Sequence, residues 1–295
     1  MSDWFRRESK NIKTVNKRDT QEGSWIKCPD CSSMIYKSVL QQDFFVCNQC
    51  SFHFRISSTE YIQILIDGDY KEIGKNILSV NPLEFNNPKD YSLQLKNAHE
   101  KTGKDDAIIV LVGKINKIKI VLGIMDFSFI GGSMGSVVGE KIARAADYAI
   151  KHKLPFVMIS KSGGARMMEA AFSLMQMAKT ASSYNKLKDK GVPFISVLSN
   201  PCTGQAYASF ANLADITIAE PSAIIGYNSL GSIPVNKYEN DHTKEEALTS
   251  EFRLKQGLLD AVVERDKLRE VLSVLLDILS KEFKVAAVNR EQNIK

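Results

Sequence analysis

The sequence predicts an α/β protein built on a mostly parallel sheet, with a small cysteine-rich module ahead of it. Short, almost continuously apolar segments recur from residue 107 onward, and segments with helical periodicity separate them. Apolar strands that alternate with helices are typical of a parallel sheet covered by helices. Two closely spaced cysteine pairs within the first fifty residues set the N-terminal module apart.

Composition narrows the class of protein. The chain has 295 residues, of which 44% are hydrophobic and 25% charged, as in globular proteins. The net charge of +5 suits an anionic ligand without demanding nucleic acid. No apolar stretch reaches eighteen residues, and residues 1–7 lack the apolar core of a signal peptide, so we expect no membrane span and a reducing, cytoplasmic location.

Four segments divide the chain. Residues 1–22 are polar without an apolar period and are expected to form a flexible arm. The cysteine module occupies 23–56, the main domain 57–285, and a polar tail 286–295. The length suits one large domain plus a small module.

The cysteine pairs have the spacing of a four-thiolate zinc ribbon. Each is a C-x2-C knuckle, with fifteen residues between them; the predicted ligands are Cys28, Cys31, Cys47 and Cys50. The alternatives are two disulfides or unrelated core cysteines. Four thiolates complete a tetrahedron and leave no position for water, so the predicted metal is structural. The aromatic residues of 44–46 and 52–56 predict a hairpin in the second half of the ribbon.

The main domain begins with an irregular helical segment at 57–104, interrupted at Pro82 and Pro88. The apolar runs that follow predict strands at 107–112, 118–124, 155–160, 193–198 and 215–219, the first two forming a pair. Helical periods cover 135–152 and 166–190, and an amphipathic helix covers 264–283.

Three glycine-containing turns lie at predicted junctions between a strand and a helix, at 131–136, 160–166 and 201–206. Glycine permits positive φ and close approach of a ligand, and free backbone N–H groups in such turns can stabilise an oxyanion. A single turn of this kind is more often a simple connection. The chain has no dinucleotide or Walker motif, and its four histidines lie outside these turns. Chemistry carried by backbone amides is therefore predicted.

Longer stretches carry a family resemblance. Residues 131–141 (GGSMGSVVGEK), 162–170 (SGGARMMEA) and 174–180 (LMQMAKT) resemble the β subunit of the bacterial and plastid acetyl-CoA carboxylase carboxyltransferase. The position and spacing of the cysteines, and the segments 218–221 (IAEP) and 224–227 (IIGY), are similar to the same family. The resemblance extends over residues 2–283.

The resemblance implies a crotonase-like fold of repeated ββα units. It also implies a transferase that moves a carboxyl group from carboxybiotin, held on a carrier protein, to acetyl-CoA and so forms malonyl-CoA for fatty acid synthesis. The implied partners are a carboxyltransferase α subunit in an α2β2 assembly, the biotin carboxyl carrier protein and biotin carboxylase. Nucleotide and ATP binding come with this enzyme complex, and the location would be bacterial cytoplasm or plastid stroma.

The same resemblance selects candidate site residues. The backbone amides expected to act in catalysis are those of Gly163, Gly164, Gly204 and Gln205. The residues expected to bind substrate are Gly131, Gly132, Ser133, Met134, Ala165, Arg166 and Thr203. For Arg166, a ligand or interface role and an internal salt bridge remain open alternatives. Lys161 is expected to be a solvated charge, and the methionines of 167–177 to pack in the core or at a subunit interface.

Two departures from the family pattern leave other functions open. The third turn of the family usually contains two consecutive glycines, whereas this chain has Gly204 and then Gln205, whose side chain could crowd a ligand or point away from it. The family's arginine is also missing from 228–233. A divergent paralogue that acts on another thioester, or acts weakly, is therefore the alternative function. A nucleic-acid-binding module is a third hypothesis, and it gives the glycine turns no role.

Overall fold

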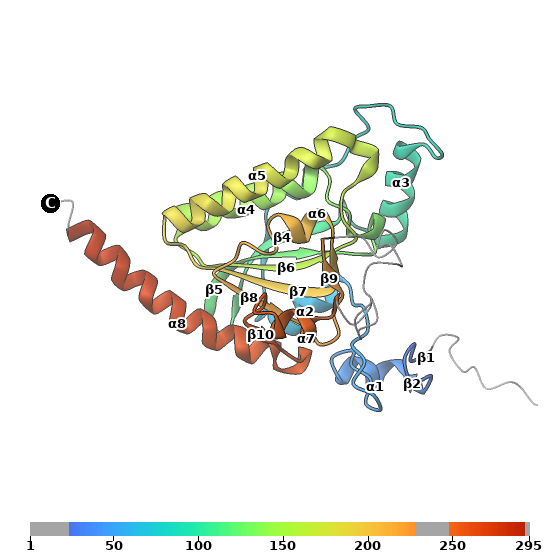
Figure 1. Cartoon of the computed structure of the whole chain (residues 1–295), viewed down its shortest axis with the longest axis horizontal. Helices are drawn as coiled ribbons and strands as arrows, with labels where there is room; N and C mark the ends of the chain where they lie inside the picture. The colour runs from blue at the N-terminus through green and yellow to red at the C-terminus, as the bar shows by residue number, and fades with distance from the viewer. Residues whose placement is uncertain (1–23, 228–247, 293–295) are drawn as a thin grey trace, which may run out of the picture. The chain divides into compact units, whose positions relative to one another are not determined.

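The computed structural model describes residues 24–227 and 248–292. The chain forms two compact units, which divide between Phe52 and His53 (Figure 1). The first unit therefore ends four residues before the predicted end of the ribbon at 56. The predicted arm at 1–22 and the departure at 228–233 lie outside the described residues.

The first unit contains a short hairpin and one helix. Strands β1 (Trp25–Lys27) and β2 (Met34–Tyr36) are antiparallel, and helix α1 (Lys37–Gln42) follows directly. The hairpin predicted for the second half of the ribbon is reduced to single bridge residues, Val46 and His53, with no strand in either predicted segment. Phe44 and Phe45 both adopt positive φ, at 54° and 59°, which ends any extended run before Cys47.

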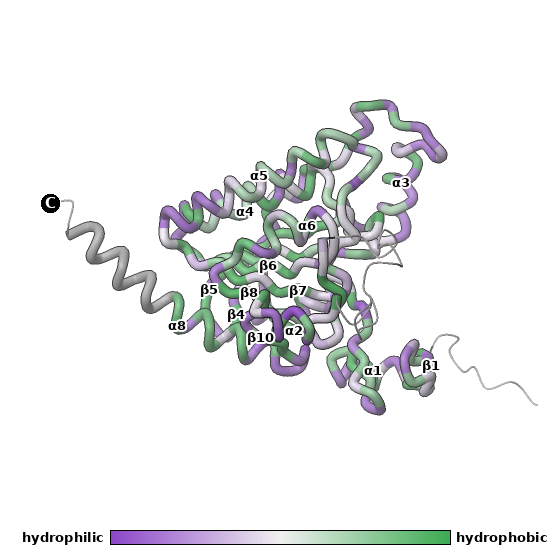
Figure 2. The backbone as a smooth tube through the Cα atoms, viewed as in Figure 1, coloured by the Kyte–Doolittle hydropathy of each residue, from purple (hydrophilic) through white to green (hydrophobic). Residues whose placement is uncertain are grey.

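One eight-stranded sheet organises the second unit, in the order β10-β8-β7-β6-β5-β4-β3, with β9 added beside β7. The five strands predicted from apolar runs are present as β4 (Ile108–Ile115), β5 (Ile118–Met125), β6 (Phe156–Ser162), β7 (Phe194–Thr203) and β8 (Ile216–Ala219). The pairs from β5 to β8 are parallel, whereas β4 is antiparallel to both its neighbours. The strands run through the most apolar part of the chain (Figure 2). Three two-residue strands were not predicted: β3 (Lys71–Glu72), β9 (Ile225–Gly226) and β10 (Ala261–Val262).

Helices cover both faces of this sheet (Figure 1). The paired helices α4 (Ser136–His152) and α5 (Ala170–Asp189), with the short α6 (Gln205–Ala208), lie over one face. Helices α2 (Ser58–Leu65), α7 (Ser250–Lys255) and α8 (Arg265–Gln292) lie over the other, and α3 (Tyr91–Thr102) stands at one end. Helix α8 runs past the predicted end at 283, since the alanines, arginine and glutamate that follow favour helix.

Candidate functional site

The four cysteines of the first unit lie together. All four sulfur atoms are within 4.8 Å of one another, and the Sγ pairs Cys28–Cys50 and Cys31–Cys47 are each 3.7 Å apart. A zinc ion with Zn–S bonds of about 2.3 Å holds tetrahedral thiolates about 3.8 Å apart. The sulfur positions therefore fit zinc, and none of these cysteines is in a disulfide.

Both C-x2-C knuckles adopt the same turn conformation. The N–H of Cys28 donates to the carbonyl of Ser33 at 2.8 Å, and the N–H of Cys47 donates to the carbonyl of Phe52 at 2.9 Å. The carbonyls of these cysteines accept from Ser32 and Ser51, which both adopt positive φ near 60°. Each turn thereby points two sulfur atoms in one direction, which is the local reason for the C-x2-C spacing.

The three glycine turns of the second unit meet at one edge of the sheet, where the carboxyl ends of neighbouring parallel strands converge. The N–H of Gly163 in the second turn donates to the carbonyl of Gly131 in the first, at 3.0 Å. A Cβ at Gly164 would lie 3.7 Å from Cα of Gly204 in the third turn. The predicted grouping of the turns is therefore present in the structure.

Close backbone contacts explain two of the glycines. A Cβ at Gly132 would lie 2.4 Å from the carbonyl oxygen of Lys161, so only glycine fits between the first turn and β6. Gly164 has φ 121°, a conformation that side chains rarely adopt. A Cβ there would also lie 3.8 Å from the backbone nitrogen of Gln205.

Only one of the four amides predicted to act in catalysis lacks an internal acceptor. The N–H groups of Gly163, Gly164 and Gly204 donate to the carbonyl of Gly131, to Oγ of Ser162 and to the carbonyl of Gly226, respectively. Among the described residues, the N–H groups of Gln205 and Ala165 donate no hydrogen bond. The second turn therefore contributes the unpaired donor of Ala165, and the third turn that of Gln205.

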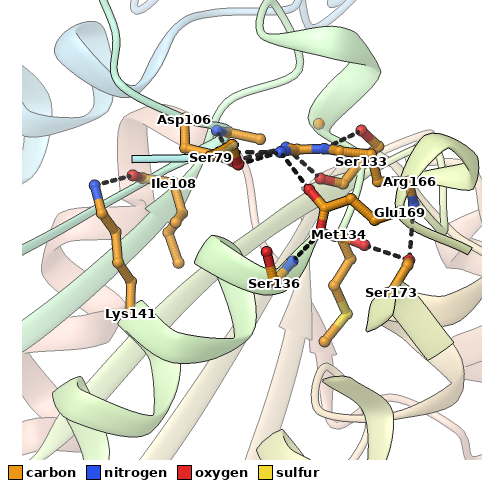
Figure 3. A network of polar contacts seen from close by, with 12 residues as sticks. Ser79, Asp106, Ile108, Ser133, Met134, Ser136, Lys141, Arg166, Glu169 and Ser173 are labelled. Carbon is orange, nitrogen blue, oxygen red and sulfur yellow. Dashed lines mark hydrogen bonds and ion pairs between the residues drawn. The ribbon is translucent and has the colours of Figure 1, made fainter. Parts of the chain in front are cut away.

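Arg166 is fully buried, with all five of its N–H donors directed at protein oxygens (Figure 3). It forms a bidentate pair with Asp106, at 2.7 and 2.9 Å, and it also donates to Oγ and the carbonyl of Ser133 and to Oγ of Ser79. This placement favours the internal salt bridge over the ligand role. Asp106 lies 60 residues away in the sequence, so no local pattern indicated it as the partner.

The carboxylate of Glu169 caps the N-terminus of helix α4. It accepts from the N–H of Ser136 at 2.6 Å and from the hydroxyl of Tyr91, also at 2.6 Å. The side chain is 1% exposed. The positive end of α4 is therefore matched by a carboxylate of the protein itself.

The other residues predicted to bind substrate fall into two groups, one accessible to solvent and one buried. Gly131 and Ala165 are partly exposed, as is Gly204 in the catalytic group, and Gly163 is exposed. Gly132, Ser133, Met134 and Thr203 are buried, and Oγ1 of Thr203 donates to the carbonyl of Ser162 at 3.2 Å. The buried members serve the geometry of the turns, and the exposed ones line the accessible part of the edge.

Lys161 is not the solvated charge that the sequence suggested. It is 1% exposed on β6, and its Nζ donates to the carbonyl of Ile56 at 2.6 Å. Burial lowers the pKa of its ammonium group to about 8. Its neighbour Glu220 forms a buried pair with Arg265, at 2.7 and 2.9 Å.

Comparison with known proteins identifies the family of this chain. Residues 81–292 match the model of the carboxyl transferase domain, and residues 25–50 match that of the acetyl-CoA carboxylase zinc finger domain. The acetyl-coenzyme A carboxylase carboxyl transferase subunit beta of Pedobacter heparinus is 46% identical over 94% of this chain and 99% of its own length. The chain belongs to this family of carboxyl transferase beta subunits. The corresponding subunit of Christiangramia forsetii is 45% identical over 95% of this chain and 98% of its own length.

A third relative is longer. The carboxyl transferase subunits beta/alpha of Natranaerobius thermophilus, one chain, is 44% identical over 92% of this chain, which covers 44% of that relative. Among solved structures, transcarboxylase 12S has a TM-score of 0.61 at 23% identity, over 74% of this chain and 40% of its own. A Pseudomonas malonate decarboxylase hetero-dimer has a TM-score of 0.58 at 21% identity, over 75% of this chain and 86% of its own.

These findings confirm the crotonase-like fold and the transferase class expected from the sequence. The expectation of nucleotide and ATP binding was wrong for this subunit, because ATP belongs to biotin carboxylase and neither matched domain supports a site for it. Within the described part of the chain, no helix has the length and apolarity needed to cross a membrane.

Proposed function

We propose that the chain transfers a carboxyl group from carboxybiotin, carried on a carrier protein, to acetyl-CoA, and so forms malonyl-CoA. The family assignment and the relatives' names support this reaction. The donors are the N–H groups of Ala165 and Gln205, in two turns that touch each other. Such a pair can stabilise the negative charge that develops on the thioester oxygen of acetyl-CoA as its methyl proton leaves.

The ionisable side chains around the turns support chemistry without a protein base. Arg166 and Glu169 are paired internally, and Lys161 donates to a backbone carbonyl. Biotin, when the carrier delivers it, supplies both the carboxyl group and the acceptor for the proton. The protein orients acetyl-CoA against the amides and excludes water from the developing charge.

The partner in this proposal is a carboxyltransferase α subunit, in an α2β2 assembly that also receives the biotin carboxyl carrier protein and biotin carboxylase. The Natranaerobius relative joins beta and alpha subunits in one chain, which supports such a partner. Large apolar side chains at the start of α5 are unusually exposed: Met167, Phe172, Leu174 and Met175, at 79%, 49%, 60% and 64%. We expect this patch to contact the α subunit. The bacterial relatives favour a cytoplasmic location.

A divergent paralogue is less well supported. The Gln205 side chain, which raised this alternative, is buried against α5 and does not project into the edge where the turns meet. The other departure, at 228–233, lies outside the described residues.

Gly164→Val tests the proposed function, with the chain co-purified with the α subunit of the same genome. The new side chain would begin 3.8 Å from the Gln205 nitrogen and reduce the space for a ligand beside it, and loss of one such donor costs about 100–1,000-fold in rate. Gly103→Val is the control, because Gly103 also has positive φ, at 66°, but ends α3 with open space around it. Malonyl-CoA formation should fall only in the first variant. Equal turnover by both variants would contradict the role of the amides.

A further inference from the structure

One buried hydroxyl contacts all three glycine turns. Ser173, early in α5, is 1% exposed. Its Oγ lies 2.7 Å from the carbonyl of Met134 in the first turn and accepts from the N–H of Arg166 in the second, at 3.0 Å (Figure 3). The same Oγ lies 3.1 Å from Oε1 of Gln205 in the third.

Gln205 holds Ser173 with both ends of its carboxamide. Oε1 faces the Ser173 hydroxyl, and Nε2 donates to the Ser173 carbonyl. The glutamine is 6% exposed, so these contacts are shielded from water. A glycine at this position could form neither contact. The side chain therefore ties α6 to the first turns of α5, and the backbone N–H of the same residue is the unpaired donor described above.

We propose that Ser173 and Gln205 are positioning residues, whose side-chain pair fixes the Gln205 N–H relative to the Ala165 N–H across the contact between the second and third turns. This inference rests on the proposed function for its catalytic consequence. The Ser173 hydroxyl accepts from the N–H of Arg166, the residue that follows Ala165, and it also contacts the Gln205 side chain. One hydroxyl is therefore linked to both donor residues. A shift of either donor weakens stabilisation of the transition state more than binding of the substrate.

Ser173 was not predicted as a site residue, although the sequence carries a pattern that includes it. Ser173, Gln176, Thr180 and Ser183 recur at intervals of three or four along the buried face of α5. Of these, only Ser173 contacts the turns: Gln176 donates to the carbonyl of Phe172, and Ser183 to that of Lys179. Gln176 and Ser183 therefore offer matched controls, because they are of the same residue types as Gln205 and Ser173 and both lie on α5.

A double-mutant cycle tests the pair, using Ser173→Ala, Gln205→Ala and the combination, with Gln176→Ala and Ser183→Ala as controls. Each variant is purified with its α subunit. Each single change at the pair should lower kcat by about tenfold or more and leave KM for acetyl-CoA within about twofold, because a misplaced donor acts on the transition state. The combination should be no slower than the slower single variant, since both changes break one tie. The controls should keep the wild-type kcat.

Hydrogen exchange supplies a readout that does not depend on turnover. Loss of the tie should raise amide exchange in residues 203–208 by about tenfold in both single variants and not in the controls. Unchanged exchange, or effects on kcat that multiply, would overturn the pair as positioning residues. If the wild-type complex forms no malonyl-CoA while the two single variants still show faster exchange than the controls, the proposed function is refuted and the tie between Ser173 and Gln205 stands.

Discussion

Arg166 and Asp106 form an ion pair that is completely removed from solvent, between β6 and the start of β4. Burial alone would raise the pKa of the Asp106 carboxyl, but the guanidinium and the hydrogen bonds that the carboxyl accepts hold it below its usual value. Because the folded pKa is the lower one, the pair contributes its full stability above about pH 4, the unfolded pKa. That stability is lost as the pH falls through the folded pKa.

Asp106→Asn should lower the free energy of unfolding by about 3–5 kcal/mol at pH 7, because it removes the bidentate counter-charge of a buried guanidinium and leaves only its 3.5 Å contact with Glu169. Urea denaturation measures the change. Glu100→Gln is the control, since Glu100 pairs with Lys96 at 4.0 Å on the exposed face of α3 and should cause no measurable loss. Similar stability of the two variants would show that Arg166 is not held by Asp106.

Lys161 gives the same direction of pH dependence as Asp106, in a higher pH range, because its folded pKa is also lowered. Its folded pKa of about 8 lies below the unfolded value, so the unfolded chain binds the extra proton between these two values. Stability of the wild type should therefore rise over this interval, by up to roughly 3 kcal/mol relative to Lys161→Met. Denaturation curves for both proteins at pH 7 and pH 10 measure the difference. If the difference in the free energy of unfolding between wild type and Lys161→Met is the same at both pH values, the lowered pKa is contradicted. Lys96→Met, at an exposed site, is the control and should give such a constant difference.

At the scale of elements, helices α4 and α5 approach closely at Gly139. A Cβ there would lie 2.1 Å from Oε1 of Gln176 and 3.0 Å from its Cβ. Gly139→Ala should therefore destabilise the protein by about 1–3 kcal/mol, although alanine ordinarily favours a helix. In a Gln176→Ala background most of this loss should disappear. Thermal unfolding of the four proteins tests the contact, and an equal loss in both backgrounds would refute it.

The elements differ in how far the sequence could predict them. Strands β4 to β8 were predicted because uninterrupted apolar runs mark strands that are buried on both faces. The ribbon hairpin was misplaced, since its position follows from the two cysteine turns rather than from the aromatic residues near Phe44. The glycine turns were predicted by local pattern. The partners of Arg166 and Gln205 were not, because side chains 60 and 32 residues away in the sequence supply them.

At the scale of the molecule, the two compact units should respond separately to loss of metal. Cys47→Ser should release zinc and unfold residues 24–52, because metal binding and folding are coupled in small ribbons. The unfolding transition of the second unit should stay in place. Metal analysis should give about one zinc per wild-type chain, as one four-thiolate site requires. Cys202→Ala, in the core of the second unit, should keep its zinc. A wild-type chain without zinc would contradict the ribbon.

The unpaired donors of Ala165 and Gln205 belong to peptide groups, and this limits what mutagenesis can reveal. Every amino acid except proline carries the same N–H, so replacing a side chain leaves the donor in the chain. An alanine scan would mark Arg166 and Glu169, which hold the fold, and the Ser173–Gln205 pair, which positions the donors, but it would leave the donor hydrogens themselves in the chain. Replacing the peptide bond at Gln205 by an ester would remove that one hydrogen and leave the side chain in place. Engineering of this centre therefore has to act on backbone chemistry.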